Sequence, residues 1–386
     1  MPTHLTRRTV LTTALGTAAL GLVAAARPAT AAPLTTAIRG RFVDVTGWPV
    51  SARVNAFAVG ASGTWAIGQQ YDSSRDHSAA ILRRRASTTG TTWAAVALPT
   101  TFRATGTAAY ADSSGVWVAG TRNDVSLPVA DGSSVVGHVS TAGTWRSFGT
   151  LGLPKWLNVD SVRAEGGQLL LTGMVPTSGG ASLRPYAASR AIDSPATVRW
   201  TSELVTAPAW DTSSAFPLLR IADGAPTWAT AGAWVLRRHG SGWTVVDVPP
   251  GTTGSTKIAC ASAQGRIHVL TQGYAGLGLW RRTDTAGSAA WVSVPLPDKF
   301  VAQAMAGDAE QLWVVGETDG GEDFAATALR VVGGKVVDRV GGPLSAGGPV
   351  GILNQVIVDP GGVLAAGYRS TQPGGLGLGW TCRPVV

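Results

Sequence analysis

Short apolar runs alternate with turns of Gly, Ser, Asp and Pro along the chain beyond residue 39. The most regular run opens with a large apolar residue and closes with Gly three positions later, as in Trp65-Ala-Ile-Gly68. Similar runs stand at residues 117–120, 170–173, 313–316 and 364–367, with weaker copies at residues 228–231 and 267–270. Short apolar runs bounded by turn residues are typical of β-strands. The chain therefore carries seven copies of one strand, with a period of about 40 to 55 residues.

Three further elements accompany most copies of this strand. A strand of small residues that ends near an acidic turn precedes it, as in Ala109-Tyr-Ala-Asp112. An apolar strand with arginine follows it, as at Leu236-Arg237. Most units then close with a Trp and, six to nine residues later, a Pro, such as Trp243 and Pro249. Four short strands in a repeat of this period predict a blade of a β-propeller.

The two ends of the chain indicate how the blades form a ring. The last unit, near residues 350–386, has three strands and lacks the Trp-to-Pro closure. A strand at residues 41–49, before the first complete unit, has the character of the missing element. Pairing of the two would remove exposed sheet edges. We therefore predict an all-β fold, a seven-bladed β-propeller closed by the N-terminal strand. Six or eight blades, or another all-β repeat, are the alternatives.

The first 31 residues have the layout of an export signal. The pair Arg7-Arg8 precedes an apolar run at residues 10–26, which is followed by the small residues Ala29-Thr30-Ala31. This order predicts a twin-arginine signal. A run of about 17 residues diluted by Thr and Gly is too short for a membrane span, which needs about 20. We expect a protein that is secreted to the extracellular space without a membrane anchor.

These features divide the chain into a signal (1–31), a short linker (32–38) and one propeller domain (39–386), which we expect to be a monomer. Within the propeller we place the closing strand at residues 39–49. The seven units are placed near residues 54–99, 105–154, 159–208, 214–250, 256–297, 301–344 and 350–386.

The positive charge of the chain comes largely from the signal and the repeat. The formal net charge is +8, and it falls to +5 without the signal, because the signal contains Arg7, Arg8 and Arg27 but no acidic residue. The arginine runs at residues 83–85, 237–238 and 281–282 recur on the third strand of their units. There an arginine stem can lie against a Trp of the neighbouring fourth strand. We therefore expect no nucleic-acid partner, whose phosphates would need a clustered basic patch.

The two cysteines are expected to be buried thiols. In the repeat, Cys260 belongs to the first strand of the fifth unit and Cys382 to the third strand of the seventh. An intervening blade would separate them by more than the about 7 Å between Cα atoms that a disulfide spans.

The Trp-x-x-Gly runs and the Trp-to-Pro closures resemble the degenerate propeller repeats of secreted actinobacterial proteins, which are similar in style to kelch and galactose-oxidase-like propellers. The resemblance covers nearly all of the chain after the signal and implies a fold, without the catalytic motifs of those families. Kelch units have a Gly-Gly pair where this chain has a single Gly, such as Gly68. The Ser-x-Asp-x-Gly-x-x-Trp box of sialidase-type propellers is also absent, because Ile221 takes the place of its Ser.

Loops between the second and third strands lie on one face of a propeller, and several of them are long and charged here. Rigidly held loops commonly carry binding groups. The ligand-binding candidates on this face are Asp72, Arg75, Asp76, His77, Arg122, Asp124, Glu317 and Asp319. Trp156 and Trp210, in connections between units, are expected to add aromatic contacts on the same face. A solvated rim is the alternative reading of any one of these residues.

These candidates favour a binding protein that recognises an extracellular glycan or protein through its loop face. The alternative is a carbohydrate-active enzyme, a glycoside hydrolase or lyase that uses a pair of loop carboxylates about 5–9.5 Å apart. We expect no cofactor. Asp319, Glu322 and Asp323 are weak candidates for Ca²⁺, because they offer oxygen ligands without the spacing of an EF-hand loop.

Overall fold

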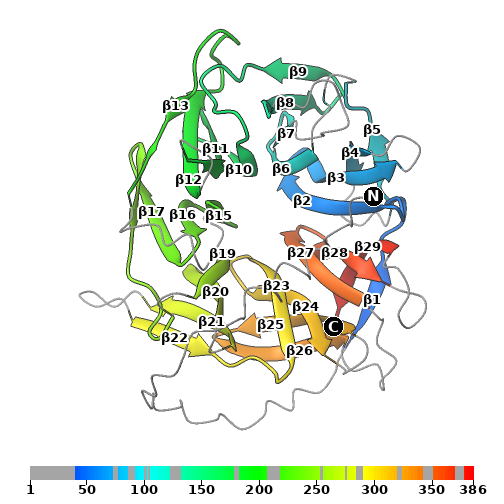
Figure 1. Cartoon of the computed structure of the whole chain (residues 1–386). Coiled ribbons are helices and arrows are strands. Elements are labelled where there is room, and N and C mark those ends of the chain that lie inside the picture. Colours follow the sequence, from blue (N-terminus) through cyan, green and yellow to red (C-terminus); the bar gives the residue numbers. More distant parts are fainter. Residues whose placement is uncertain are drawn as a thin grey trace, which may run out of the picture. The chain divides into compact units, whose positions relative to one another are not determined.

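The structure is a computed structural model that describes residues 40–72, 77–85, 92–99, 102, 105–121, 132–177, 182–206, 218–252, 255–273, 276–283, 290–319, 324–341, 351–369 and 378–386. These residues belong to one compact unit that spans residues 34–386. Within them there are 29 strands and no helix, and the strands form seven small sheets arranged in a ring (Figure 1). The fold is therefore a seven-bladed β-propeller, as the repeat predicted.

Each blade is numbered here in chain order, and its strands run outward from the axis. The innermost strands of blades 1 to 7 are β2 (Ala52–Gly60), β6 (Thr105–Ala111), β10 (Asn158–Glu165), β15 (Arg220–Ala222), β19 (Thr256–Ala263), β23 (Phe300–Gly307) and β27 (Gly351–Asp359). The second strands are β3 (Gly63–Asp72), β7 (Gly115–Thr121), β11 (Gln168–Pro176), β16 (Ala225–Ala231), β20 (Arg266–Gly273), β24 (Leu312–Asp319) and β28 (Gly362–Arg369).

The third strands are β4 (His77–Arg85), β8 (Ser134–Ser140), β12 (Leu183–Ala191), β17 (Trp234–His239), β21 (Gly276–Thr283), β25 (Phe324–Val332) and β29 (Leu378–Val385). The outer strands are β5 (Ala94–Val96), β9 (Trp145–Phe148), β13 (Thr201–Ser202), β18 (Gly242–Val245), β22 (Ala290–Val294), β26 (Lys335–Gly341) and β1 (Arg41–Asp44). Blade 4 has a fifth strand, β14 (Leu204–Thr206), which pairs in parallel with β18.

The N-terminal strand closes the ring, as predicted. β1 pairs antiparallel with β29, from Arg41 opposite Val385 to Asp44 opposite Cys382. Blade 7 is thus built from both ends of the propeller, and β1 covers the edge of β29 and becomes the outer strand of the blade.

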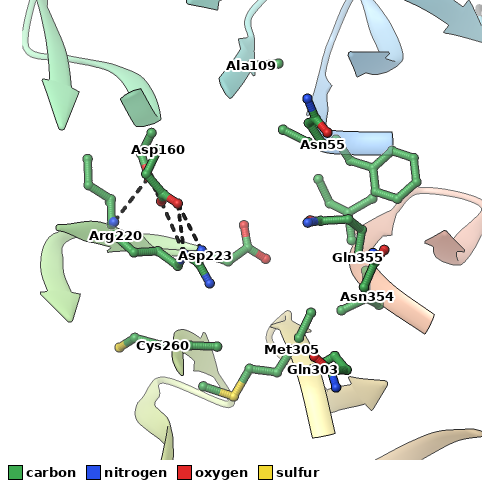
Figure 2. Close-up of a pocket in the computed structure, with 18 of the residues that line it drawn as sticks. Asn55, Ala109, Asp160, Arg220, Asp223, Cys260, Gln303, Met305, Asn354 and Gln355 are labelled. Atoms are coloured by element: carbon green, nitrogen blue, oxygen red, sulfur yellow. Dashed lines mark hydrogen bonds and ion pairs between the residues drawn. The ribbon is translucent and has the colours of Figure 1, made fainter. Parts of the chain in front are cut away.

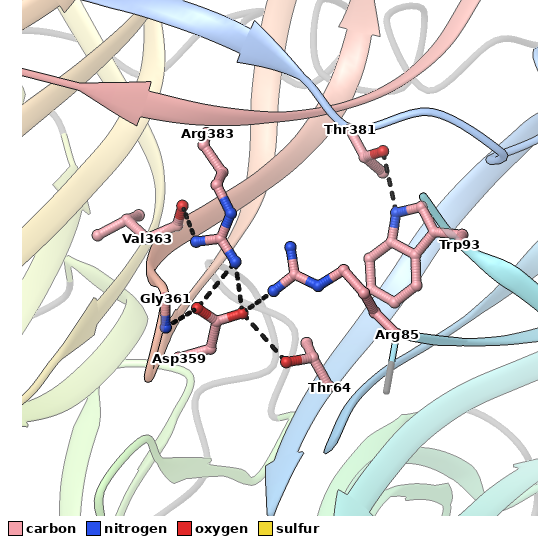
Figure 3. Close-up of polar contacts among 8 residues, drawn as sticks. All are labelled: Thr64, Arg85, Trp93, Asp359, Gly361, Val363, Thr381 and Arg383. Carbon is pink, nitrogen blue, oxygen red and sulfur yellow. Dashed lines mark hydrogen bonds and ion pairs between the residues drawn. The ribbon is translucent and has the colours of Figure 1, made fainter. Parts of the chain in front are cut away.

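A buried ionic cluster, which we call the seam latch, fastens blade 7 to blade 1 (Figure 3). Asp359, at the end of β27, accepts hydrogen bonds from Arg85 of blade 1, from Thr64 of blade 1 at 3.0 Å and from Arg383 of β29 at 2.8 Å. The side chains of Arg85 and Asp359 are 1% and 0% exposed. Burial lowers the pKa of Arg85, although the negative charge of Asp359 acts to raise it. The latch therefore holds charges that have little access to water.

The repeated Trp-x-x-Gly runs lie on the second strands, where their large residues fill the core between blades. Trp65, Trp117 and Trp313 are each at most 3% exposed. In blade 5 the run begins one residue later than the predicted copy at residues 267–270. His268, not Ile267, takes the Trp position, because His268 faces Arg281 across the ladder as Trp65 faces Arg84. The arginines of the third strands stack on Trp rings. Arg282 lies over Trp291 of the fourth strand at 5.8 Å, as expected, whereas Arg84 lies over Trp65 of the second strand at 5.0 Å.

The Gly of the clearest runs lies against a β-bulge in the neighbouring innermost strand, whereas blade 5 forms the same bulge opposite Thr271. A Cβ on Gly68, Gly173 or Gly316 would lie 2.0 Å from the carbonyl oxygen of Arg53, Asn158 or Val301, respectively. In each case the pairing of the innermost strand with the second strand skips the residue two positions after that carbonyl, namely Asn55, Asp160 or Gln303. The bulged residue is left out of the ladder and is re-aimed. In these three blades the glycine thus permits the close approach of the two strands beside the bulge.

Gly316→Ala is expected to destabilise the propeller by about 1–3 kcal/mol, because the new methyl group overlaps the backbone of β23. The free energy of unfolding in urea measures the effect. Gly242→Ala on β18 is the matched control, since a Cβ there would meet its nearest atom at an ordinary 3.6 Å. Equal losses for the two variants would contradict the role of the glycine in the bulge.

Both cysteines are free and buried, as predicted. Cys260 lies on β19 and Cys382 on β29. Burial raises the pKa of Cys260 to about 12, so its thiol is not an accessible thiolate at neutral pH. We expect no labelling by a maleimide in the folded protein and two labels per chain in denaturant without reductant, counted by mass spectrometry. A denatured chain that takes up no label would contain a disulfide and contradict this arrangement.

Candidate functional site

Two adjacent cavities lie along the axis of the propeller. The first, about 150 Å³, is lined by residues of all seven innermost strands, and we call it the loop chamber. The second, about 410 Å³, is lined by residues further along most of these strands, such as Val59 and Ala111, and by Gly224 and Pro226 of blade 4, and we call it the opposite chamber. Phe57, Arg163, Asp223 and Ile357 line both cavities and form a waist between them.

The loop chamber opens toward the face on which the sequence placed the binding loops. Its polar residues lie near the beginnings of the innermost strands. Ala52, at the start of β2, pairs with Gln70 near the end of β3, and the loop to β4 follows directly. The starts of the innermost strands and the loops between second and third strands therefore share one face, the loop face.

Bulged residues of four innermost strands supply the polar lining of the loop chamber. They are Asn55 of β2, Asp160 of β10, Gln303 of β23 and Asn354 of β27. Each stands thirteen residues before the Gly of its own unit, as Asn55 does before Gly68. Because a bulge turns its extra residue out of the ladder, one repeated backbone feature directs four polar side chains to the axis.

Blades 3 and 4 give the loop chamber a charged side (Figure 2). The guanidinium group of Arg220 donates to both carboxylate oxygens of Asp160 at 3.0–3.2 Å and to the carbonyl oxygen of Ile258 at 2.7 Å. The attraction of Asp160 raises the pKa of Arg220. This bidentate pair joins blades 3, 4 and 5 and occupies the carboxylate of Asp160.

Asp223 and Arg163 place a second acid and a second base at the waist. The carboxyl group of Asp223 points into the cavity (Figure 2). Burial raises its pKa, while Arg163 and backbone hydrogen bonds from Gly307 and Gly224 act in the other direction. Arg163 donates from Nη1 to the carbonyl oxygens of Ala109 and Val162. Among the described residues no ion pair joins Asp223 to Arg163.

Blades 6, 7 and 1 give the loop chamber a neutral side made of carboxamides. Asn55, Asn354 and Gln355 lie across the cavity from Asp160 and Arg220 (Figure 2). Within the part of the chain that the structure describes, the amides of Gln303, Asn354 and Gln355 have no hydrogen-bond partner. A carboxamide both donates and accepts hydrogen bonds. The chamber therefore offers neutral polar groups that a ligand can satisfy.

Three of the predicted ligand residues have described side chains. Trp156 precedes β10 and is 45% exposed, and its ring lies over Gly132, where a Cβ would be 2.4 Å from it. Its φ of 60° is shared by Lys299, which also stands four residues before a bulged residue, so two blades have this strained backbone at the same position. Asp319 is exposed at the end of β24. Glu317 was expected in a loop, and this position is wrong, because it lies within β24 and is 8% exposed.

The other candidates are not described in atomic detail. Asp72 ends β3 and His77 begins β4, so both lie at the loop face. Arg75, Asp76, Arg122, Asp124, Trp210, Glu322 and Asp323 lie outside the described residues. The calcium candidates therefore stay a prediction. Among the described residues, no group of three or more His, Cys, Asp or Glu side chains could hold a metal ion.

The axial residues were not predicted from the sequence, because the charged loops were its most prominent polar feature. The sequence does contain one signal for these residues. In four blades the bulged residue stands thirteen positions before the Gly that ends the repeated run. A polar residue at that position in a strand of small apolar residues marks a side chain turned to the axis.

Comparisons with known proteins support the fold. No protein-family model and no curated protein matches the sequence. A structure of YCF48 bound to a D1 peptide is similar with a TM-score of 0.52 and 13% identity, over 90% of this chain and 96% of that chain. A prolyl endopeptidase structure is similar with a TM-score of 0.52 and 11% identity, over 82% of this chain and 45% of that chain. At these identities the likeness shows the propeller fold alone. The described residues contain no helix long and apolar enough to cross a membrane.

Proposed function

We propose that this chain is an exported, extracellular binding protein that recognises a protein partner at the loop face. A polar side chain or a chain end of the partner enters the loop chamber. The observation that carries the proposal is the set of carboxamides without partners at the axis, from Gln303, Asn354 and Gln355. Peptide groups and polar side chains both donate and accept hydrogen bonds, as these amides do.

The size of the loop chamber supports a small inserted group. Its volume of about 150 Å³ is below the roughly 300–1,000 Å³ of pockets that enclose a whole drug-sized ligand. The similar propeller YCF48, whose structure holds a D1 peptide, gives a precedent for peptide binding on this fold.

A glycan is the second candidate ligand, and Trp156 favours it. Its half-exposed ring stands on the loop face, four residues before Asp160. An exposed indole offers a flat apolar surface on which a sugar ring could stack. A glycan held in this way would depend on Trp156 more than on the carboxamides.

A glycoside hydrolase is less well supported by the axial carboxylates. Asp160 and Asp223 both line the loop chamber, but the two oxygens of Asp160 are held by Arg220. An acid or nucleophile on a sugar needs an oxygen that can reach the substrate.

The test is binding of the chain from residue 32 onward to a library of extracellular peptides and to a glycan array. Asn354→Ala combined with Gln355→Ala should weaken binding of a peptide by about tenfold or more, since each neutral hydrogen bond contributes about 0.5–1.5 kcal/mol. Gln168→Ala, an exposed carboxamide at the opposite face, should leave binding unchanged. Unchanged peptide affinity in the double variant would overturn the proposal. Glycan binding lost on Trp156→Ala would select the second candidate.

A further inference from the structure

The opposite chamber has the character of a small-molecule pocket. Its volume of about 410 Å³ lies within the usual range for such pockets. Most of the side chains that line it are apolar, among them Phe57, Pro226, Ile357 and the ring of Tyr110. Arg163 and Asp223 are its only ionisable groups among the described lining residues apart from the phenol of Tyr110. An apolar cavity with few convergent polar groups is the usual form of a ligand site.

The two charged groups define the head that such a ligand would carry. The guanidinium of Arg163 lies 5.9 Å from the Tyr110 ring centre, and its Nε and Nη2 make no hydrogen bond within the described residues. Asp223 offers carboxylate oxygens and forms no ion pair with Arg163 there. The guanidinium of Arg163 and the carboxylate of Asp223 therefore both face the same cavity without forming an ion pair with each other.

We propose that the opposite chamber binds a small organic molecule with a planar apolar body and a neutral head that both accepts and donates hydrogen bonds, such as a carboxamide. The head accepts from Arg163 and donates to Asp223, and the body lies among Phe57, Tyr110 and Pro226. This proposal does not rest on the protein partner proposed for the loop face, although Phe57, Arg163 and Asp223 line both chambers.

A neutral head follows from the balance of charge. An anionic head would pair with Arg163 but would meet the carboxylate of Asp223. A cationic head would pair with Asp223 but would meet the guanidinium of Arg163. Like charges at close range in a partly buried site oppose binding.

Three probes of similar size separate these possibilities, namely benzamide, benzoate and benzylammonium. Saturation-transfer NMR titrations of the chain from residue 32 onward should give a Kd for benzamide in the millimolar range, as expected for a ligand of about nine non-hydrogen atoms. Benzoate and benzylammonium should bind at least about tenfold more weakly. Equal binding of the three probes, or none by benzamide at 50 mM, would overturn the proposal.

Variants then locate the bound probe. Asp223→Asn removes the negative charge at nearly constant shape, so benzoate should gain about tenfold in affinity relative to benzamide. Tyr110→Leu, which changes only the opposite chamber, should weaken benzamide about fivefold. Gln355→Ala, which changes only the loop chamber, should leave benzamide binding unchanged. Benzamide binding that is lost in Gln355→Ala and kept in Tyr110→Leu would place the molecule in the loop chamber and contradict this site. Tyr110→Leu decides the question if Asp223→Asn does not fold.

Discussion

Asp359→Asn should lower the free energy of unfolding by about 3–5 kcal/mol, the range for breaking a buried ion pair by removal of one partner. Asp359 neutralises both Arg85 and Arg383 in the seam latch. The variant would leave two guanidinium groups facing each other around a neutral amide. Arg85 has no alternative partner, because its Nε and Nη1 are already buried without a hydrogen bond among the described residues. Urea denaturation followed by tryptophan fluorescence measures the loss.

Asp44→Asn is the matched control in the same blade. Asp44 pairs with Arg369, but the two side chains are 47% and 40% exposed. Exposed ion pairs contribute about 0–1 kcal/mol, so this variant should lose less than about 1 kcal/mol. The asparagine oxygen can still accept the hydrogen bond from Trp380. Similar losses in the two variants would mean that the seam latch is not a site of buried charge.

Acid should destabilise the propeller through His268. This side chain is 1% exposed on β20, and burial lowers its pKa to about 4, helped by the nearby Arg281 and Arg266. In the unfolded chain a histidine has a pKa of about 6.5. The unfolded state therefore takes up the proton first, and stability that is fully present above pH 6.5 is lost as the pH falls toward 4. The loss through this one residue is about 3 kcal/mol.

His268→Gln isolates this contribution, because glutamine does not titrate. The difference in unfolding free energy between the natural protein and the variant should change by about 3 kcal/mol between pH 7.5 and pH 4. Burial also lowers the pKa of His138, which remains in both proteins and cancels from the difference. A pH-independent difference would show that His268 is not buried in its neutral form.

The fold was predictable from sequence because the same core positions recur in several copies of the repeated unit. Trp65, Trp117 and Trp313 occupy the same place on the second strands, so their spacing revealed the blades. The incomplete last unit revealed the closure by β1, because an unpaired strand edge is unfavourable. In blade 5 His268 stands where other blades have Trp, so the run was predicted at residues 267–270, one residue too early.

The axial site was less predictable, for a physical reason. A bulge reverses the direction of a side chain without any change in the apolar pattern around it. Nothing in the apolar pattern around Asn55 and Gln303 therefore indicates that they line the loop chamber. The pairing of Asp160 with Arg220 joins residues of different blades, which a repeat alignment cannot reveal. Glu317 was misplaced because β24 continues to Asp319, beyond the expected end of the strand.

Closure of the ring by β1 also governs the order of folding. Each of blades 1 to 6 is made from one stretch of chain, so its hairpins can form as soon as that stretch is available. Blade 7 must bring Arg41 to Val385, and contacts so distant in sequence form slowly. We therefore expect a late step in which a nearly complete, open ring closes at the boundary of blades 7 and 1. The rate of opening at that boundary, rather than the stability of an average blade, would then set the lifetime of the native protein.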